Sequence, residues 1–282
     1  MVSMIIVDYK SMDKTYEYIA SCAKTIKGID HFVIVDNAST EPIAPCVSDF
    51  DGNVVCIVSS GENAGYARGN NLGAKTALDL WKDEYYIFSN NDLRIDKPFD
   101  VSELLAPFKE DSNIAVVGPR ILGLDGGDQN PLPEFSDNYL LFGHFLSLLP
   151  PKKLVRAKQA VKREKGKCRA VCGAFICAKA EDFNAVGGFD ENTFLFMEEE
   201  ILSKRLKPLG KYMYYNDSVE VIHEHSVTVR SVMSVVKSLQ YDFDSRYYYS
   251  KTYTHAGPIK LALSKANYHT CLALFKLKKA LR

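Results

Sequence analysis

The chain is organised around the segment Tyr85-Tyr86-Ile87-Phe88-Ser89-Asn90-Asn91-Asp92. Its first four residues are large and favour β structure, and small polar residues and a carboxylate follow them. This pattern predicts a buried strand that ends in a polar loop. In open α/β sheets, ligands bind just outside the carboxyl ends of the strands. Asp92 is therefore a candidate for binding a ligand or a metal, whereas the plainer interpretation is a carboxylate that caps a turn or a helix.

Apolar runs alternate with helical stretches on both sides of this segment. Continuous apolar strands that alternate with helices indicate an α/β fold with a mostly parallel sheet covered on both faces. The glycine-bearing loop Gly61–Gly65 precedes one of these helices. The strands predicted here are Val2–Val7, Phe32–Val35, Val54–Val58, Tyr85–Phe88 and Ile114–Val117, and the helices are Met12–Ile26 and the stretch that ends near Trp81.

The second half of the chain is less regular. Residues 123–167 lose the periodic pattern and carry glycines, prolines and a basic run, so we expect an insertion over one edge of the sheet. That insertion is either a solvated basic surface or a loop that orders over an anionic ligand. We expect a domain over residues 1–226 and a helical extension over 227–282. Further predicted elements are strands Arg169–Ala178, Tyr212–Tyr215 and Val219–Ile222, and helices Glu181–Val186 and Ile201–Leu209.

Composition narrows the class of protein. The chain has 35 Lys and Arg and 35 Asp and Glu among 282 residues, and this zero net charge argues against a general nucleic-acid binder. Its 7 cysteines are odd in number and several lie in apolar runs, which favours reduced, buried thiols in a cytoplasmic protein over disulfides. The residues Met1–Tyr9 form a strand pattern without a basic leader, so we expect no signal peptide.

The segment Pro258–Arg282 is basic and contains no acidic residue. Its leucines and its isoleucine could form an apolar stripe along a helix. Such a helix is a candidate for lying on an anionic membrane surface, and the alternative is a helix that packs on its own domain.

Two clusters of side chains join Asp92 as candidates for chemistry. Glu198, Glu199 and Glu200 follow the apolar segment Phe194-Leu195-Phe196, which predicts a partly buried acid with a pKa raised toward that of a general base. The alternative is a set of carboxylates that stabilises a helix N-terminus. His223 and His225 follow the strand that ends at Ile222, and histidine beside carboxylates is a common ligand of Mn²⁺.

Several motifs in this order resemble family 2 glycosyltransferases, which have the GT-A fold, and in particular bacterial rhamnosyltransferases. The resemblance covers roughly residues 2–226 and leaves the helical tail outside. It rests on residues 3–9 (SMIIVDY), 35–40 (VDNAST), 63–71 (NAGYARGNN), 88–92 (FSNND), 118–122 (GPRIL), 186–190 (VGGFD) through Glu199, and 221–223 (VIH).

The resemblance implies a role for each matching residue. Asp92 and His223 would hold Mn²⁺ or Mg²⁺, Glu199 would be the catalytic base, and Glu198 would contact the acceptor, whereas Glu200 is expected to be solvated. The chain departs from the family's Asp-x-Asp motif, because Asn90-Asn91-Asp92 keeps a single carboxylate. The residues implied to bind the nucleotide-sugar are Asp8, Asp36, Asn63, Arg68, Asn70, Asn90 and Asn91.

The expected activity is an inverting, metal-dependent transfer of a sugar from a UDP-, GDP- or dTDP-sugar to a hydroxyl of a glycan or lipid-linked acceptor. The expected setting is synthesis of a cell-surface polysaccharide such as O-antigen or capsule, in the cytoplasm or at the inner membrane face. A non-catalytic nucleotide- or carbohydrate-binding module remains an alternative. A sugar-phosphate nucleotidyltransferase is disfavoured, because Asp8-Tyr9-Lys10-Ser11 stands where those enzymes carry a glycine-rich phosphate loop.

Overall fold

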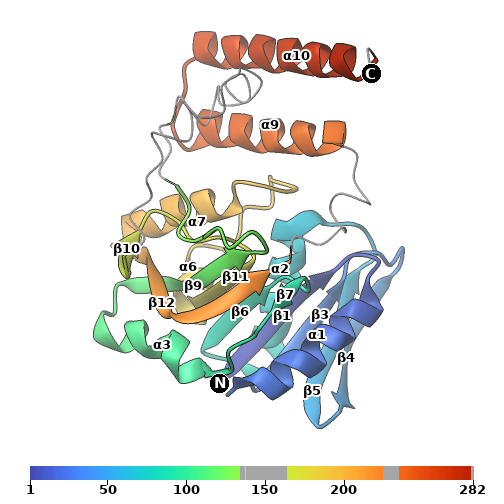
Figure 1. Ribbon diagram of the computed structural model, residues 1–282, viewed down its shortest axis with the longest axis vertical. Helices are drawn as coiled ribbons and strands as arrows, with labels where there is room; N and C mark the ends of the chain where they lie inside the picture. Colours follow the sequence, from blue (N-terminus) through green and yellow to red (C-terminus); the bar gives the residue numbers. More distant parts are fainter. Residues whose placement is uncertain (134–136, 138–163, 225–234, 281–282) are drawn as a thin grey trace.

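The computed structural model describes residues 1–133, 137, 164–224 and 235–280. In this part of the chain a twisted sheet lies beneath two C-terminal helices (Figure 1). Its order is β10-β12-β9-β11-β6-β1-β3-β5-β4, and β7 pairs with β12. The strands are β1 Val2–Asp8, β3 His31–Asp36, β4 Pro42–Phe50, β5 Asn53–Ser60, β6 Tyr85–Ser89, β7 Leu93–Arg94, β9 Ile114–Gly123, β10 Gly166–Cys168, β11 Phe175–Lys179 and β12 Tyr212–His223, with β2 Ile26–Lys27 and β8 Phe99–Asp100 forming a separate pair.

Helices cover both faces of this sheet. Their bounds are α1 Met12–Thr25, α2 Gly65–Trp81, α3 Val101–Glu110, α6 Ala180–Ala185, α7 Glu198–Leu206, the 3₁₀ turn η1 Lys207–Leu209, α9 Val235–Thr252 and α10 Pro258–Ala280. The parallel core β6-β1-β3-β5, α1 and α2 agree with the elements predicted from the apolar pattern.

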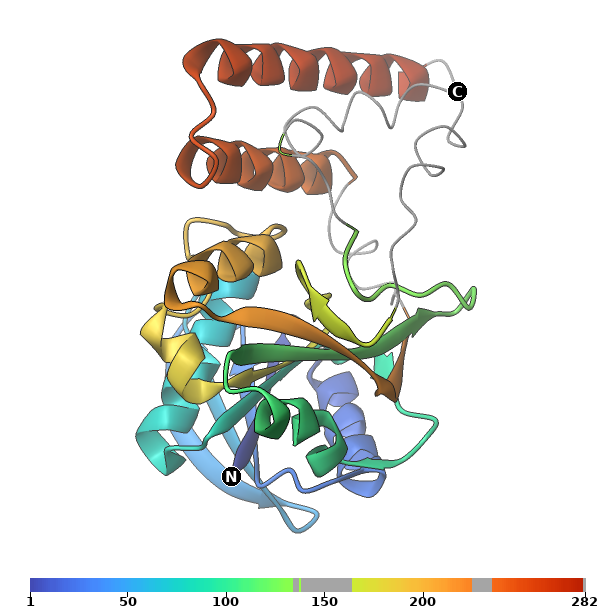
Figure 2. The ribbon, with the colours of Figure 1, turned by 90° about the vertical axis from the view of Figure 1, so that its left-hand side faces the viewer.

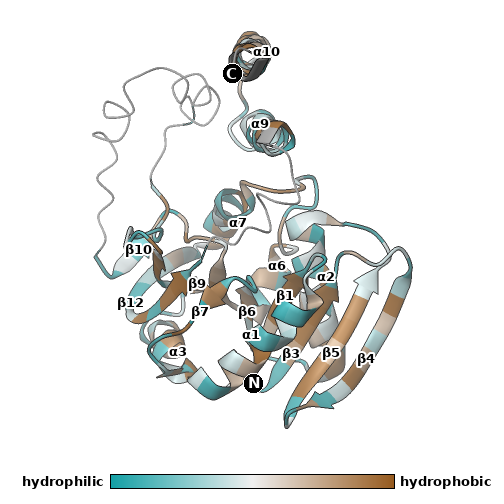
Figure 3. Cartoon of the chain, turned by 45° about the vertical axis from the view of Figure 1, so that its right-hand side comes forward, coloured by the Kyte–Doolittle hydropathy of each residue, from teal (hydrophilic) through white to brown (hydrophobic). Residues whose placement is uncertain are grey.

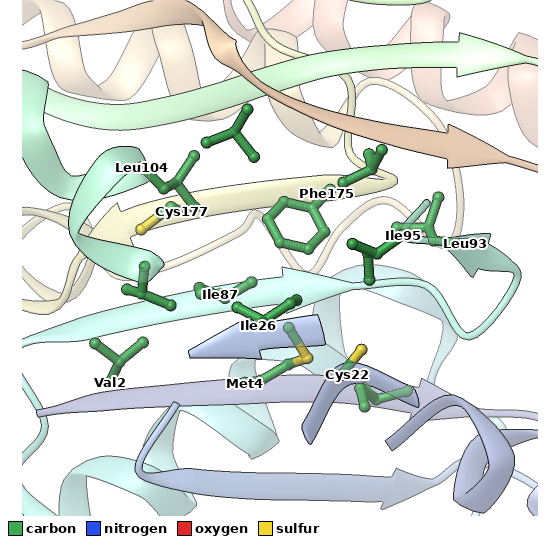
Figure 4. Close-up of a cluster of buried hydrophobic side chains, with 14 of the residues drawn as sticks. Val2, Met4, Cys22, Ile26, Ile87, Leu93, Ile95, Leu104, Phe175 and Cys177 are labelled. Carbon is green, nitrogen blue, oxygen red and sulfur yellow. The ribbon is translucent and has the colours of Figure 1, made fainter. Parts of the chain in front are cut away.

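Alternation along the strands explains the two layers of core. Met4 and Ile6 of β1 join a buried cluster on the side of α1, whereas Ile5 between them joins a cluster on the side of α2. Figure 4 shows the first cluster, in which Met4 and Ile87 lie near Cys22 of α1. Apolar residues line the central strands in Figure 3. The second face is packed closely, since a Cβ on Gly73 of α2 would lie 2.4 Å from Ile5 Cγ2.

The structure differs from the predictions where long-range pairing decides the element. The sheet is mixed, because β11 is antiparallel to both β6 and β9, and the antiparallel edge strand β4 was not predicted. The strand predicted over Arg169–Ala178 is regular only in its second half, β11. The two strands predicted between Tyr212 and Ile222 form one strand, β12, which is interrupted by a bulge between Asn216 and Glu220.

The C-terminal helices stack on the end of the sheet domain, and α9 is the nearer of the two (Figure 2). α9 packs Tyr249 against Met197 and Ile201, and α10 packs on α9 through the stacked rings of Phe243 and Tyr268. Much of the predicted insertion over 123–167 lies outside the described residues. Within the described ranges, every helix is too short or too polar to cross a bilayer.

Candidate active site

Strand pairing brings Asp92 and His223 together. Asp92 follows β6, and its neighbour Leu93 in β7 pairs with His223 at the end of β12. The backbone N–H of Glu224 donates to the Asp92 carbonyl at 3.0 Å. As a result, His223 Nε2 lies 3.4 Å from Asp92 Oδ1, and both side chains are largely buried. Two residues 131 positions apart in the sequence therefore share one polar site.

The donor set at this site suits a divalent cation. His223 Nδ1 lies 2.8 Å from the side-chain oxygen Oε1 of Gln129. In the tautomer in which Nδ1 donates to that oxygen, Nε2 presents its lone pair toward the carboxylate of Asp92. Ligands about 2.1 Å from a shared octahedral cation are about 3 Å apart, so the spacing of the two atoms fits. One carboxylate and one imidazole leave the other positions to water and substrate phosphates, as is usual for Mg²⁺ and Mn²⁺.

A cavity of about 270 Å³ opens at the carboxyl ends of β1, β3 and β6. This cavity, which we call the donor pocket, has walls of amide, hydroxyl and aromatic side chains, and Asp92 lies in it. Its position is the one at which α/β sheets bind ligands. The residues that line it are Val7, Tyr9, Ser11, Asn37, Asn63, Gly65, Tyr66, Asn70, Ser89, Asn90, Asn91, Asp92, Phe194, Leu195, Lys237 and Tyr241.

Four of the seven residues implied to bind a nucleotide-sugar line this pocket: Asn63, Asn70, Asn90 and Asn91. The amide of Asn91 donates to Thr15 Oγ1 at 2.7 Å and to Ser11 Oγ at 2.9 Å. This hydrogen-bond network fixes the loop after β6 against the start of α1.

Asp8 and Asp36 lie beside the donor pocket, in an adjoining open depression. The buried carboxylate of Asp8 accepts hydrogen bonds from Ser11 Oγ at 2.8 Å and from Thr15 Oγ1 at 2.7 Å. The carboxylate of Asp36 accepts from the backbone N–H of Ala38 at 2.8 Å. Asp8 therefore shapes the loop after β1, and Asp36 lies where it can reach a ligand at the rim.

The structure places Arg68 away from the donor pocket. Its side chain is about half exposed, and it lies 3.5 Å from Glu62 and 3.9 Å from Glu191. It is not among the lining residues. The resemblance implied a nucleotide contact for Arg68, and in this structure the guanidinium instead faces two surface acids.

A second cavity, of about 390 Å³, adjoins the first and contains the acidic pair. We call it the acceptor cavity, and it shares Tyr66, Asn90 and Leu195 with the donor pocket. Glu198, Glu199 and His223 are in its lining, and His223 also lies beside Asp92 of the donor pocket, so residues from the three distant candidate clusters come together. His225 lies outside the described residues. The other lining residues are Leu132, Pro133, Cys172, Gly173, Ala174, Phe196, Met197, Glu200, Asp242 and Arg246.

An unusual backbone conformation presents Glu199 to this cavity. Phe196 and Met197 have positive φ of 75° and 72°, which non-glycine residues rarely adopt and which occurs at functional sites. Helix α7 begins at Glu198 rather than at Ile201, the predicted start. Glu199 Oε1 accepts a hydrogen bond from the Gly173 N–H at 2.7 Å, and a Cβ at Gly173 would lie 2.5 Å from that oxygen.

Burial raises the pKa of both Glu198 and Glu199. For Glu198, the charge of Glu199 adds to the effect of desolvation. Its Oε1 is buried without a hydrogen-bond partner among the described residues. Two neighbouring carboxyl groups in a water-poor site favour sharing one proton, which keeps one carboxylate available as a base.

Glu200 corrects one expectation from the sequence. It is buried rather than solvated, and its carboxylate pairs with Arg169 Nε at 2.8 Å. Burial raises its pKa, and the charge of Arg169 opposes that rise. Since it is paired, Glu200 anchors the first turn of α7 to the segment after β10.

Sequence patterns did not point to several residues of the two cavities. Lys237 and Tyr241 of α9 reach the donor pocket, and Asp242 and Arg246 reach the acceptor cavity. No local motif marks them, because their role depends on where α9 packs. A hint lay in their spacing, which puts positions 237 and 241 one helical turn apart.

Three curated relatives are similar in sequence. The "Low-salt glycan biosynthesis hexosyltransferase Agl10" of Haloferax volcanii is 29% identical over 226 residues, covering 80% of this chain and 68% of the relative. The "O-antigen chain rhamnosyltransferase WbaN" of Salmonella anatum is 25% identical, covering 70% and 58%. The "N-acetylglucosaminyl-diphospho-decaprenol L-rhamnosyltransferase" of Mycobacterium tuberculosis is 25% identical, covering 79% and 76%.

A solved structure and a family model complete the comparison. GalNAc-T7, solved with UDP, GalNAc and Mn²⁺, superposes with a TM-score of 0.56 at 14% identity, over 80% of this chain and 44% of that one, which establishes a shared GT-A fold. The model "Glycosyl transferase family 2" matches residues 3–181. With the acidic pair, the strand-end carboxylate and the doubly covered sheet in place, the chain belongs to glycosyl transferase family 2 and is a glycosyltransferase resembling the bacterial rhamnosyltransferases.

Proposed function

We propose that this glycosyltransferase moves a sugar from a UDP-, GDP- or dTDP-linked donor to a hydroxyl of a glycan or lipid-linked acceptor, with inversion and with Mn²⁺ or Mg²⁺. The proposed setting is the assembly of a cell-surface polysaccharide, such as O-antigen or capsule. Two relatives named for glycan or O-antigen synthesis and one named for a diphospho-decaprenol acceptor support this setting.

One observation carries the proposal: a buried carboxylate and a cation-binding pair lie on adjoining cavities. Glu199 lines the acceptor cavity with His223, and His223 lies 3.4 Å from Asp92 of the donor pocket. A sugar attached to a diphosphate in the donor pocket would thus have its anomeric carbon near the boundary that Asn90 and Tyr66 form between the cavities.

The chemistry follows from the charge that develops. Breaking the glycosidic bond leaves negative charge on the diphosphate. Asp92 and His223 would hold a divalent cation there, and the cation would supply electrostatic stabilisation of that charge. Glu199 takes the proton from the acceptor hydroxyl as that oxygen bonds to the anomeric carbon. Its hydrogen bond from Gly173 occupies one carboxylate oxygen and fixes the orientation of the other. Attack from the side opposite to the leaving diphosphate inverts the anomeric centre.

Helix α10 supports a position at the inner membrane face. Ile259, Leu263, Leu274 and Leu277 are all at least half exposed, and their helical angles fall within about 60° of one another. The face that packs on the rest of the protein, with Leu261, Tyr268 and Cys271, lies on the opposite side. Exposed lysines at 260, 265 and 276 accompany the apolar stripe, as in helices that bind anionic lipid surfaces.

A thermal-shift panel tests the donor class. UDP-, GDP- and dTDP-sugars are each added with and without Mn²⁺. At a hundredfold excess over Kd, the true donor is expected to add about 3 kcal/mol to the free energy of unfolding and so to raise the Tm. The shift should shrink when Asp92 is changed to Asn. If all three donor classes leave the Tm unchanged with the metal present, the proposed donor chemistry is wrong.

A turnover assay separates an enzyme from a binding module of the same fold. The donor found by the panel is mixed with isolated lipid-linked glycan acceptors, and release of free nucleoside diphosphate is measured. An enzyme releases it at a rate that depends on acceptor concentration, whereas a module binds the donor and releases none.

A further inference from the structure

The donor pocket needs a positive side chain that the family motifs do not supply. The diphosphate of a nucleotide-sugar carries two negative charges and the carboxylate of Asp92 carries a third, so a single divalent cation at Asp92 and His223 leaves one negative charge uncompensated. Arg68, the cationic residue implied by the resemblance, faces Glu62 and Glu191 and does not line the pocket.

Lys237 of α9 lies where it can supply this positive side chain. Among the described residues that line the donor pocket, Lys237 is the one cationic side chain and Asp92 the one acidic side chain. Lys237 lies outside residues 3–181, the part of the chain that the family model matches. A lysine ammonium binds phosphate as a compact point charge, and it needs no fixed bidentate geometry to do so.

Contacts from the catalytic domain fix α9 at the mouth of the pocket. Lys237 Nζ lies 5.6 Å from the ring centroid of Tyr241, and that ring stacks on Phe194 with centroids 4.4 Å apart. One turn further along, Ser245 Oγ donates to the Leu195 carbonyl at 2.8 Å. The same loop, residues 194–197, leads directly into Glu198 and Glu199.

We propose that α9 is a substrate-binding element and that Lys237 contacts the diphosphate of the donor, with the stacked Tyr241 and Phe194 forming the adjacent wall. This assignment rests on the proposed nucleotide-sugar donor. The C-terminal extension then completes a donor site that residues 3–181 leave open on one side.

Calorimetric titration with excess Mn²⁺ tests the assignment. UDP, GDP and dTDP are titrated into the full chain, and the diphosphate that binds is compared with the nucleoside of the same base. For Lys237→Ala, Kd for the diphosphate should rise about tenfold, and Kd for the nucleoside should stay within about twofold, because a charged hydrogen bond to phosphate is lost and base contacts are not. Lys237→Arg should restore most of the affinity. Lys251→Ala, an exposed lysine at the other end of α9, is the matched control.

The possible outcomes separate this assignment from the donor proposal. If the unaltered protein binds a diphosphate and Lys237→Ala binds it equally well, Lys237 is not a phosphate ligand and the donor proposal stands. Equal weakening of diphosphate and nucleoside would mean that the substitution disturbs the pocket as a whole, which also overturns the assignment. If none of the three diphosphates binds the unaltered protein, both proposals fail.

Discussion

Glu199 has two features that a catalytic base needs, a fixed orientation and a raised pKa. Changing it to Gln keeps the volume and removes the proton acceptor. We expect kcat to fall by about 10²- to 10⁴-fold. Donor affinity measured by titration should remain within about twofold, because Glu199 lies in the acceptor cavity. Glu181→Gln, exposed on α6, serves as the control. Near-normal turnover in Glu199→Gln would show that another group is the base.

The neighbouring Glu198 should destabilise the folded protein at neutral pH. Its pKa is raised in the folded state by burial and by the charge of Glu199. A carboxyl with a raised pKa contributes stability below its unfolded pKa of about 4.3, and this contribution is lost as pH rises through the folded value. Glu198→Gln should therefore raise the Tm at pH 8 by roughly 2–4 °C, equivalent to about 1 kcal/mol.

The gain should shrink toward pH 4.5, where Glu198 of the unaltered protein is itself protonated. Scanning calorimetry across this range measures the trend. A Tm difference that does not change with pH would show that the effect of Glu198→Gln comes from packing and not from ionisation.

At the scale of elements, the bend before β11 and the N-terminus of α7 depend on each other. Gly173 brings its N–H to Glu199, and an added Cβ would meet both Glu199 Oε1 and Tyr66 Oη, the latter at 3.2 Å. Gly173→Ala should displace the carboxylate and lower kcat at least about tenfold. The Tm should change by less than about 3 °C, because the crowded atoms are ends of side chains that can move.

Gly257→Ala is the matched substitution, since a Cβ there meets nothing within 4 Å. Its kcat and Tm should both match those of the unaltered protein. If Gly173→Ala is as active as Gly257→Ala, the hydrogen bond from Gly173 does not orient the base.

Docking of α9 couples the C-terminal helices to the segment that precedes the acidic pair. Asp190 accepts hydrogen bonds from Tyr248 at 2.9 Å and from Tyr253, both on or just beyond α9. Burial alone would raise the pKa of Asp190, but these hydroxyls and the amide of Asn192 hold it below its ordinary value. The carboxylate of the motif over residues 186–190 therefore serves as the anchor of the helix that reaches both cavities.

The whole molecule presents the apolar stripe of α10 on its outer surface, opposite the face that packs on α9. We expect the protein to co-sediment with vesicles containing phosphatidylglycerol, less so at high salt, and not with pure phosphatidylcholine. The double change Leu263→Glu and Leu274→Glu should abolish this binding. Leu80→Glu, an exposed leucine on α2, should leave it intact. Equal binding by both variants would exclude α10 as the lipid-contacting surface.

Local patterns in the sequence were sufficient for the parallel centre of the fold and for the enzyme class. The apolar runs of β1, β3, β5 and β6 are continuous because both sheet faces are covered, and that signal is readable within a few residues. The family could be recognised for a similar reason, because its motifs are short polar segments that follow strands and they occur along this chain in the family's order.

Local patterns could not predict the surroundings of residues whose neighbours come from distant segments of the chain. Glu200 is buried beside Arg169, and the exposed Arg68 lies beside Glu62 and Glu191 and does not line the pocket. Lys237 enters the pocket because α9 docks on the loop before α7. Periodicity along a chain reports which face of an element is apolar. It carries no information about which charges another element will bring to that face, and packing in three dimensions settles that.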